Sequence, residues 1–218
     1  MMTGMFRRYR TLAIVFLLGC SSLAAQSNQS VVMDSDMRLF TAMTALNAAG
    51  FDVELGSQYH PVRQMVRDLG AKLDPDLRTR LRDFYQTHKR NQPDADQLAK
   101  YISLAVILSG PPDFKLPVRE EFLPPDARDV KDFADLMREV FLQAKLSSVW
   151  PEVRSQYEQE INRWGPAIRE QLVRTDAYLR IVLGSATTRT LDILVELAAP
   201  INSVNVRSDQ DNYYVVLG

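Results

Sequence analysis

The sequence predicts a mainly α-helical fold: a bundle-like domain of several helices, followed by a short C-terminal β-hairpin or small antiparallel sheet. Apolar residues recur at intervals of three and four between Asp34 and Leu183, which is the spacing of one face of an α-helix. After Gly184 this pattern gives way to short segments rich in β-branched and aromatic residues. No internal repeat of fixed period is present, so a helical-repeat solenoid is disfavoured.

The first four helices are predicted from their start signals. A capping side chain or a proline at the first helical position marks a helix N-terminus, because that turn has backbone N–H groups without partners inside the helix. Glycine after an apolar series marks an end, and Gly50 and Gly110 have this position. The start signals are Asp34-Ser35, His60-Pro61, Asp74-Pro75 and Pro93-Asp94.

Residues 110–126 form the clearest predicted loop, with five prolines in 17 positions. A free linker would be uniformly polar, whereas this segment carries several large apolar side chains. We therefore expect an ordered strap that lies on the helices. Its apolar members are Phe114, Leu116, Val118, Phe122 and Leu123.

Two further apolar stripes follow the strap, over 130–144 and 150–172. In the second stripe Trp150, Tyr157 and Trp164 recur at helical spacing, so we expect all three to be buried in the core rather than to form a sugar-stacking platform. Gly165-Pro166 interrupts this stripe and predicts a kink or a break into two helices.

Three strands are predicted near the C-terminus, at Thr190–Leu197, Ser203–Arg207 and Tyr213–Leu217. The polar residues 209–212 between the last two supply turn chemistry for a hairpin. A hairpin needs a third strand or a helix to cover its apolar face. The helical domain could provide that cover, or residues 185–218 could be the truncated start of a second domain.

Residues 1–25 have the three parts of a bacterial-type signal peptide. Arg7, Arg8 and Arg10 form a positive head, Leu12–Leu18 is an apolar run, and small residues follow up to Ala25. The apolar run is much shorter than the ~20 residues that a transmembrane helix needs. We therefore expect export to the periplasm or outer membrane, with residues 26–33 as a flexible tether and 34–184 as the helical domain.

Cys20 is the only cysteine of the chain and lies at the end of the segment Leu17-Leu18-Gly19-Cys20. This segment resembles the lipobox of bacterial lipoproteins, in which the cysteine becomes the lipid-carrying N-terminus. The resemblance implies that a lipid on Cys20 attaches the protein to the membrane. Cleavage after Ala24 or Ala25 is the alternative, and it would discard the cysteine.

Composition excludes some classes of function. The chain has 26 Lys+Arg and 27 Asp+Glu, a balance that disfavours nucleic acid as a partner, since nucleic-acid binders carry an excess of basic residues. No HExxH, P-loop, GxSxG or GxGxxG motif is present, so the sequence predicts no metal site and no cofactor. His60 and His88 are interpreted as helix-terminal residues, and most carboxylates as a solvated helix face.

The organisation of the chain also carries a resemblance. An export signal, a long helical region and then strands ending in residues 212–218 resemble the front half of uncharacterised exported bacterial proteins that are similar to gluzincin-type zinc metallopeptidases. In that family a strand precedes the helix that carries the zinc ligands. No such helix occurs in this sequence, so the resemblance assigns no catalytic residue.

Two functional hypotheses remain. In the first, the chain is an exported, lipid-anchored envelope module that binds a protein or peptide partner through a groove. In the second, it is the N-terminal part of a zinc metallopeptidase-like enzyme whose catalytic helix lies beyond Gly218.

Overall fold

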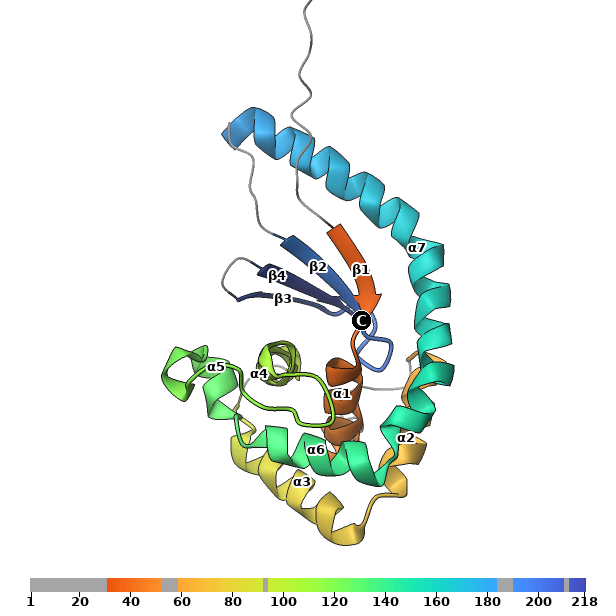
Figure 1. Cartoon of the computed structure of the whole chain (residues 1–218), viewed down its shortest axis with the longest axis vertical. Coiled ribbons are helices and arrows are strands. Elements are labelled where there is room, and N and C mark those ends of the chain that lie inside the picture. Colours follow the sequence, from red (N-terminus) through yellow and green to blue (C-terminus); the bar gives the residue numbers. More distant parts are fainter. Residues whose placement is uncertain (1–30, 52–58, 92–93, 184–189, 210–211) are drawn as a thin grey trace, which may run out of the picture.

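The computed structural model describes residues 31–51, 59–91, 94–183, 190–209 and 212–218 (Figure 1). The predicted signal peptide, Cys20, Gly184 and the centre of the 209–212 turn lie outside the described residues. The described parts contain seven α-helices, one short 3₁₀ helix and four strands. The helices are α1 (Met37–Ala49), α2 (Pro61–Ala71), α3 (Pro75–His88), α4 (Asp94–Ile107), η2 (Glu120–Phe122), α5 (Pro125–Asp129), α6 (Phe133–Gln143) and α7 (Leu146–Leu183).

The predicted fold class, mainly α with a small C-terminal sheet, is confirmed. The strands β1 (Val31–Ser35), β2 (Thr190–Val195), β3 (Val204–Asp209) and β4 (Asn212–Leu217) lie in the order β1-β2-β4-β3. The β3–β4 pair is antiparallel, as the hairpin prediction requires, whereas β1–β2 and β2–β4 are parallel. The sheet is therefore mixed.

Strand β1 corrects the expectation that strands occur only after Gly184. Its residues Val31–Met33 fall within the predicted flexible tether 26–33, yet they pair in register with Leu191–Ile193. The partner strand lies about 160 positions along the chain, so no local pattern could reveal the pairing. Because Asp34 and Ser35 are part of β1, the N-cap of α1 is Asp36.

The other helix boundaries follow their predicted signals. The Asp74 side chain accepts a hydrogen bond from the backbone N–H of Asp76, and Pro75 occupies the first turn of α3. His60 caps α2 in the same way, ahead of Pro61. Gly50 ends α1 in the left-handed conformation with φ 103°, which glycine adopts without steric cost.

Helix α1 is the centre of the core. Ten of its 13 residues are buried, including Thr41, Thr44 and Asn47, each of which donates a side-chain hydrogen bond to the carbonyl four residues earlier. Helices α2, α3, α4 and α6 pack around α1. On the sheet, Leu194 and Val216 belong to the same core, so the helices cover one face of the sheet.

The strap over residues 110–124 is ordered, as predicted. Phe114 and Leu123 are buried, whereas Phe122 is exposed and contradicts the expectation for that residue. The guanidinium of Arg128 donates hydrogen bonds to the carbonyls of Glu120 and Leu123, which fixes the strap against α5.

Helix α7 is continuous over 38 residues, so of the two alternatives predicted at Gly165-Pro166, a kink or a break into two helices, the break is wrong. Proline removes one backbone hydrogen bond and crowds the preceding turn, which bends a helix without ending it. Pro151 and Pro166 both lie inside α7, and Figure 1 shows the helix curved, with its concave side toward the sheet. Among the described residues, no helix is long and apolar enough to cross a membrane.

Candidate functional site

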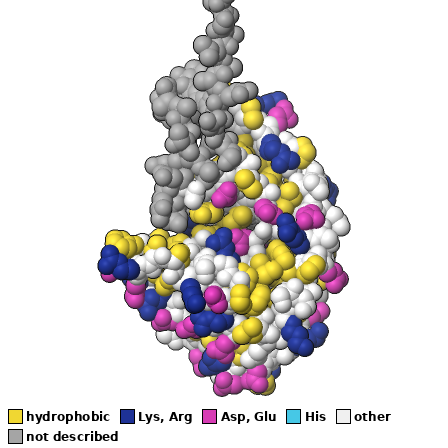
Figure 2. All heavy atoms as spheres, viewed as in Figure 1, with side chains coloured by type: hydrophobic (Ala, Val, Ile, Leu, Met, Phe, Trp, Pro, Cys, Tyr) yellow, Lys and Arg dark blue, Asp and Glu magenta, His cyan; other side chains and the backbone are white. Residues whose placement is uncertain are grey.

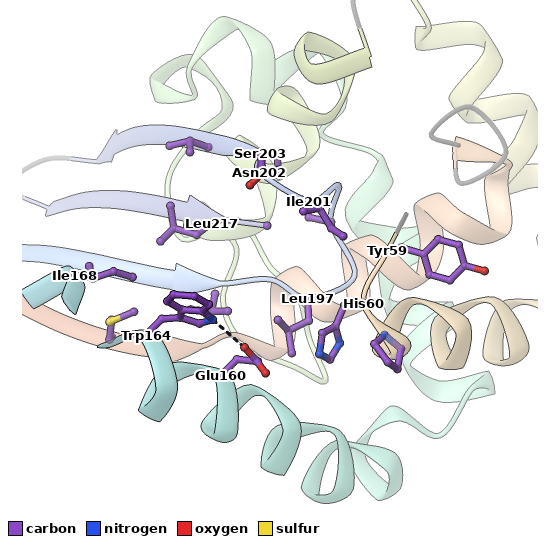
Figure 3. Close-up of a pocket in the computed structure, with 16 residues that line it drawn as sticks. Tyr59, His60, Glu160, Trp164, Ile168, Leu197, Ile201, Asn202, Ser203 and Leu217 are labelled. Carbon is purple, nitrogen blue, oxygen red and sulfur yellow. Dashed lines mark hydrogen bonds between the residues drawn. The ribbon is translucent and has the colours of Figure 1, made fainter. Parts of the chain in front are cut away.

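A cavity of about 680 Å³ lies between the sheet and the concave side of α7 (Figure 3). We call it the α7 groove. The sheet, α7, the segment between β2 and β3, and the residues that lead into α2 all contribute to it. Its lining residues are Met33, Tyr59, His60, Pro61, Glu160, Trp164, Ile168, Val195, Leu197, Ala199, Ile201, Asn202, Ser203, Val204, Leu217 and Gly218.

The floor of the α7 groove is an apolar row across three strands. Val195 of β2 pairs with Leu217 of β4, which pairs with Val204 of β3, so the three side chains lie side by side on one face of the sheet. Val204 is 63% exposed. The row lies at the carboxyl ends of the parallel strands β2 and β4, the end of such sheets at which ligands usually bind.

The wall of the groove formed by α7 includes Trp164, whose predicted burial is wrong. Trp150 and Tyr157 are buried in the core as expected, but Trp164 is 53% exposed. Its indole Nε1–H donates to Glu160 Oε2 over 3.0 Å, and the Arg163 guanidinium lies 5.0 Å from the indole ring centre. The predicted apolar stripe lies on one face of α7, but only the residues in its first half are buried in the helical core.

His60 and Glu160 lie at one end of the groove (Figure 3). The backbone N–H of Val62 donates to His60 Nδ1 over 3.2 Å, so the proton of a neutral imidazole is on Nε2. Burial lowers the pKa of His60, and the negative charge of Glu160 only partly opposes this effect. Apart from His60, Glu160 is the only ionisable acidic or basic side chain among the described lining residues.

The opposite end of the groove is formed by the turn between β2 and β3. Asn202 has a positive φ of 63° there, and its backbone N–H donates to the Gly218 carbonyl over 3.1 Å. The hydroxyl of Ser203 is buried and has no hydrogen-bond partner among the described residues. This end therefore carries two polar side chains, Asn202 and Ser203.

The second histidine is far from this site. His88 stacks on Phe84 with ring centres 4.0 Å apart, and its Nδ1 lies 2.8 Å from the Phe84 carbonyl. It lines a separate, shallow cavity with Asp132 and Asp135. In the described part of the chain, no group of three or more His, Cys, Asp or Glu side chains could hold a metal ion.

The carboxylates considered from sequence mostly form surface ion pairs. Arg154 Nε lies 3.1 Å from Glu158, and the Arg90 guanidinium lies 2.8 Å from Asp129. Asp209 belongs to β3, while Asp211 of the predicted 209–212 turn lies outside the described residues. The structure therefore gathers none of these groups into a paired-carboxylate site.

Sequence reasoning missed one buried polar pair, Glu196 and Tyr157. Both residues are fully buried, and the Tyr157 hydroxyl donates to Glu196 Oε1 over 2.7 Å. The backbone N–H of Ala198 donates to the same oxygen over 3.0 Å, whereas Oε2 has no partner among the described residues. The only sequence signal was that Glu196 is the one polar residue in the apolar run 193–199.

Burial raises the pKa of Glu196 to about 7, although the hydrogen bonds from Tyr157 and Ala198 act in the opposite direction. Burial likewise raises the pKa of the Tyr157 hydroxyl, so tyrosine stays the donor. Glu196 thus exchanges a proton near neutral pH while it holds α7 to the end of β2.

Replacing Glu196 by glutamine should remove a pH dependence of stability. The folded-state pKa of about 7 lies above the ordinary value of 4.5, so the folded state retains a proton that the unfolded state loses. The free energy of unfolding should therefore fall between pH 4.5 and 7, by about 3 kcal/mol. Glu196→Gln cannot ionise, and urea unfolding over this range should show a flatter profile.

Glu158→Gln is the matched control, because Glu158 is an exposed glutamate on α7. Its profile should follow that of the wild type. If the free energy of unfolding changed equally with pH in the wild type and in Glu196→Gln, a raised pKa at Glu196 would be contradicted.

No family model, curated protein or solved structure matches this chain. The α7 groove and the chemistry of its own residues are therefore the basis for a functional proposal.

Proposed function

We propose that this chain is an exported, lipid-anchored envelope protein whose α7 groove binds an extended peptide segment of a partner protein. The observation that carries the proposal is the apolar row Val195, Leu217 and Val204, which faces the half-exposed indole of Trp164 across the groove.

The size and lining of the groove suit a ligand with apolar side chains. Ligand pockets usually measure about 300–1,000 Å³, with mostly apolar walls and a few polar groups that fix orientation. The α7 groove holds about 680 Å³, and its polar groups are at its two ends. An exposed tryptophan is also the residue type most often found to dominate the energy of protein interfaces.

The edge strand β3 favours an extended peptide as the ligand. It forms one edge of the sheet and pairs, among the described residues, only with β4. An edge strand presents a row of backbone N–H and C=O groups that a peptide can pair with, while adjacent pockets receive its side chains. β3 begins at Val204, which lines the groove, and Val206 is 56% exposed on the same strand.

The charge of the groove favours a basic residue in that peptide. Glu160 is the only acidic side chain among the described lining residues, which include no Lys or Arg, and it lies next to Trp164. A lysine or arginine side chain can pair with a carboxylate and stack on an indole. Arg163 makes both contacts in the free protein, 3.7 Å from Glu160 and 5.0 Å from the indole centre, and a basic residue of the peptide would take its place. Elsewhere charges are mixed: on the face in Figure 2, basic and acidic side chains are interspersed.

Export and anchoring are supported by the N-terminal sequence pattern. Ten residues separate Cys20 from Val31, where β1 begins. An extended chain spans at most about 3.5 Å per residue, so a lipid on Cys20 would keep the domain within about 40 Å of the membrane. The proposed partner would then be another envelope protein or a peptide that passes close to the membrane.

Ile168→Asp should weaken peptide binding, because it replaces an apolar contact on the wall of the groove by a group that must lose its water when the peptide binds. Peptides can be selected from a displayed random library on the purified protein, and their binding measured by fluorescence anisotropy. The selected peptides should alternate apolar residues with at least one Lys or Arg. Binding to Ile168→Asp should be at least ten-fold weaker.

Val173→Asp provides the matched control, since Val173 lies on the same helix, is 70% exposed and does not line the groove. It should bind the selected peptides like the wild type. Equal binding by both aspartate variants, or a failure to enrich any such peptides, would refute the groove as a peptide site.

Lipidation predicts a defined mass for the exported protein. After expression in a bacterial host, intact mass spectrometry should show a mature chain that begins at Cys20 and carries a diacylglycerol-type modification. The variant Cys20→Ser should be absent from the membrane fraction, because it has no cysteine to carry the lipid. A lipid-free wild-type product that begins at Ala25 or Gln26 would contradict this part of the proposal.

The second candidate function is the N-terminal part of a zinc metallopeptidase-like enzyme. It is supported by the position of β4, an interior strand between β2 and β3, because in the resembled family a strand precedes the zinc-binding helix. The described residues supply no zinc ligand set, so they carry no catalytic step. An open reading frame beyond the Gly218 codon that encodes a histidine-containing helix would support this candidate, and a stop codon there would reject it.

A further inference from the structure

We propose that His60 makes peptide binding in the α7 groove sensitive to pH, so that the groove holds its peptide at neutral pH and releases it in mild acid. This inference rests on the proposed function, because it concerns the regulation of the same groove. His60 lines the groove beside Glu160, the carboxylate that we expect to attract the basic residue of the peptide (Figure 3). A proton on His60 therefore changes the charge at the place where that residue binds.

The hydrogen bond between His60 and α2 requires the neutral form of the imidazole. His60 is the N-cap of α2, and its Nδ1 accepts a hydrogen bond from the backbone N–H of Val62 over 3.2 Å. Nδ1 can accept only while it carries no proton, so protonation of the ring would set two N–H groups against each other and break the cap. The charged ring would also lie at the positive end of the α2 dipole. Protonated His60 therefore cannot keep its position against α2.

Few charged groups act on His60. The carboxylate of Glu160 on α7 does so across the end of the groove, and Arg163 of the same helix lies 3.7 Å from that carboxylate. On its own segment His60 lies between Tyr59 and the first turn of α2, where the Arg63 guanidinium is 5.7 Å from the centre of the Tyr59 ring. The described lining residues of the sheet and of the β2–β3 segment carry no acidic or basic side chain.

The titration of His60 opposes the binding of a basic residue. Burial lowers the pKa of His60 below its ordinary value of 6.5, although the negative charge of Glu160 acts in the opposite direction. The ring is therefore neutral at pH 7.5 and gains a proton as the pH falls toward 5. A positive imidazole would repel the Lys or Arg of the peptide and compete with it for the Glu160 carboxylate. Because linkage is reciprocal, the bound peptide must lower the pKa of His60 further.

The pH dependence of peptide binding tests this inference. The probe is a selected peptide with blocked ends that contains Lys or Arg but no His, Asp or Glu, so that only the protein titrates. For the wild type, its dissociation constant in fluorescence anisotropy should rise at least five-fold between pH 7.5 and pH 5. In His60→Asn the two constants should be nearly equal. Asparagine is a preferred N-cap residue and does not titrate, so this variant keeps the cap of α2 and loses only the proton.

His88→Asn is the matched control, because His88 is the other histidine of the chain and lies outside the groove. It should keep the pH dependence of the wild type. Glu196 has a pKa of about 7 and also titrates in this range, but it does not line the groove. Glu196→Gln should therefore keep the pH dependence as well. Loss of the pH dependence in Glu196→Gln and its retention in His60→Asn would assign the effect to Glu196 and overturn the inference.

Proton NMR of the two histidine rings provides a second measurement. When the peptide binds, the His60 resonance should titrate at a lower pH, whereas the His88 resonance should not respond. A peptide that binds equally well at pH 7.5 and pH 5, or whose binding changes equally in the wild type and in His60→Asn, would overturn the role of His60 and leave the peptide site in place. Failure to select any peptide would instead refute the proposed function and this inference with it.

Discussion

The hydrogen bond between Tyr157 and Glu196 fixes α7 to the carboxyl end of β2, and the shape of the candidate site depends on it. Tyr157 packs edge-on against Phe40 of α1, with ring centres 6.5 Å apart, and lies 5.7 Å from Trp150. The backbone N–H of Glu196 donates to the Leu217 carbonyl over 2.7 Å. One buried pair thus connects the long helix, the central helix and two strands.

Beyond Tyr157, the same stripe of α7 leaves the helical core. Glu160, Trp164 and Ile168 face the sheet across the α7 groove, and the row formed by Val195, Leu217 and Val204 is its floor. Helix α7 packs on the helical core only through its first half, and it is curved. Apolar surface is therefore left uncovered on both walls of the α7 groove, on α7 and on the sheet. Exposed apolar surface of this kind is usually found at interaction sites.

The local features of this fold were predictable, because each depends on neighbouring residues. Asp74 with Pro75, His60 with Pro61, and Gly50 each specify a helix end through backbone chemistry within one turn. The β3–β4 hairpin is equally local. Strand β1 was missed because Val31–Met33 gains its partner from Leu191–Ile193, at the other end of the chain.

The candidate site was less predictable, because periodicity gives the apolar face of a helix but not what covers it. Trp164 has the same spacing as Tyr157, yet the core ends between them. The partner of Glu196 could not be predicted from neighbouring residues, because Tyr157 is 39 residues away in the sequence.

Hydrogen–deuterium exchange along α7 tests most directly whether this helix is anchored in its first half and uncovered in its second. Amides between Val153 and Tyr157 should exchange only through global unfolding, because they lie over the core. Amides from Trp164 to Thr175 should exchange much faster and become protected when a selected peptide binds. Uniformly slow exchange along the whole helix, unchanged by peptide, would contradict the account.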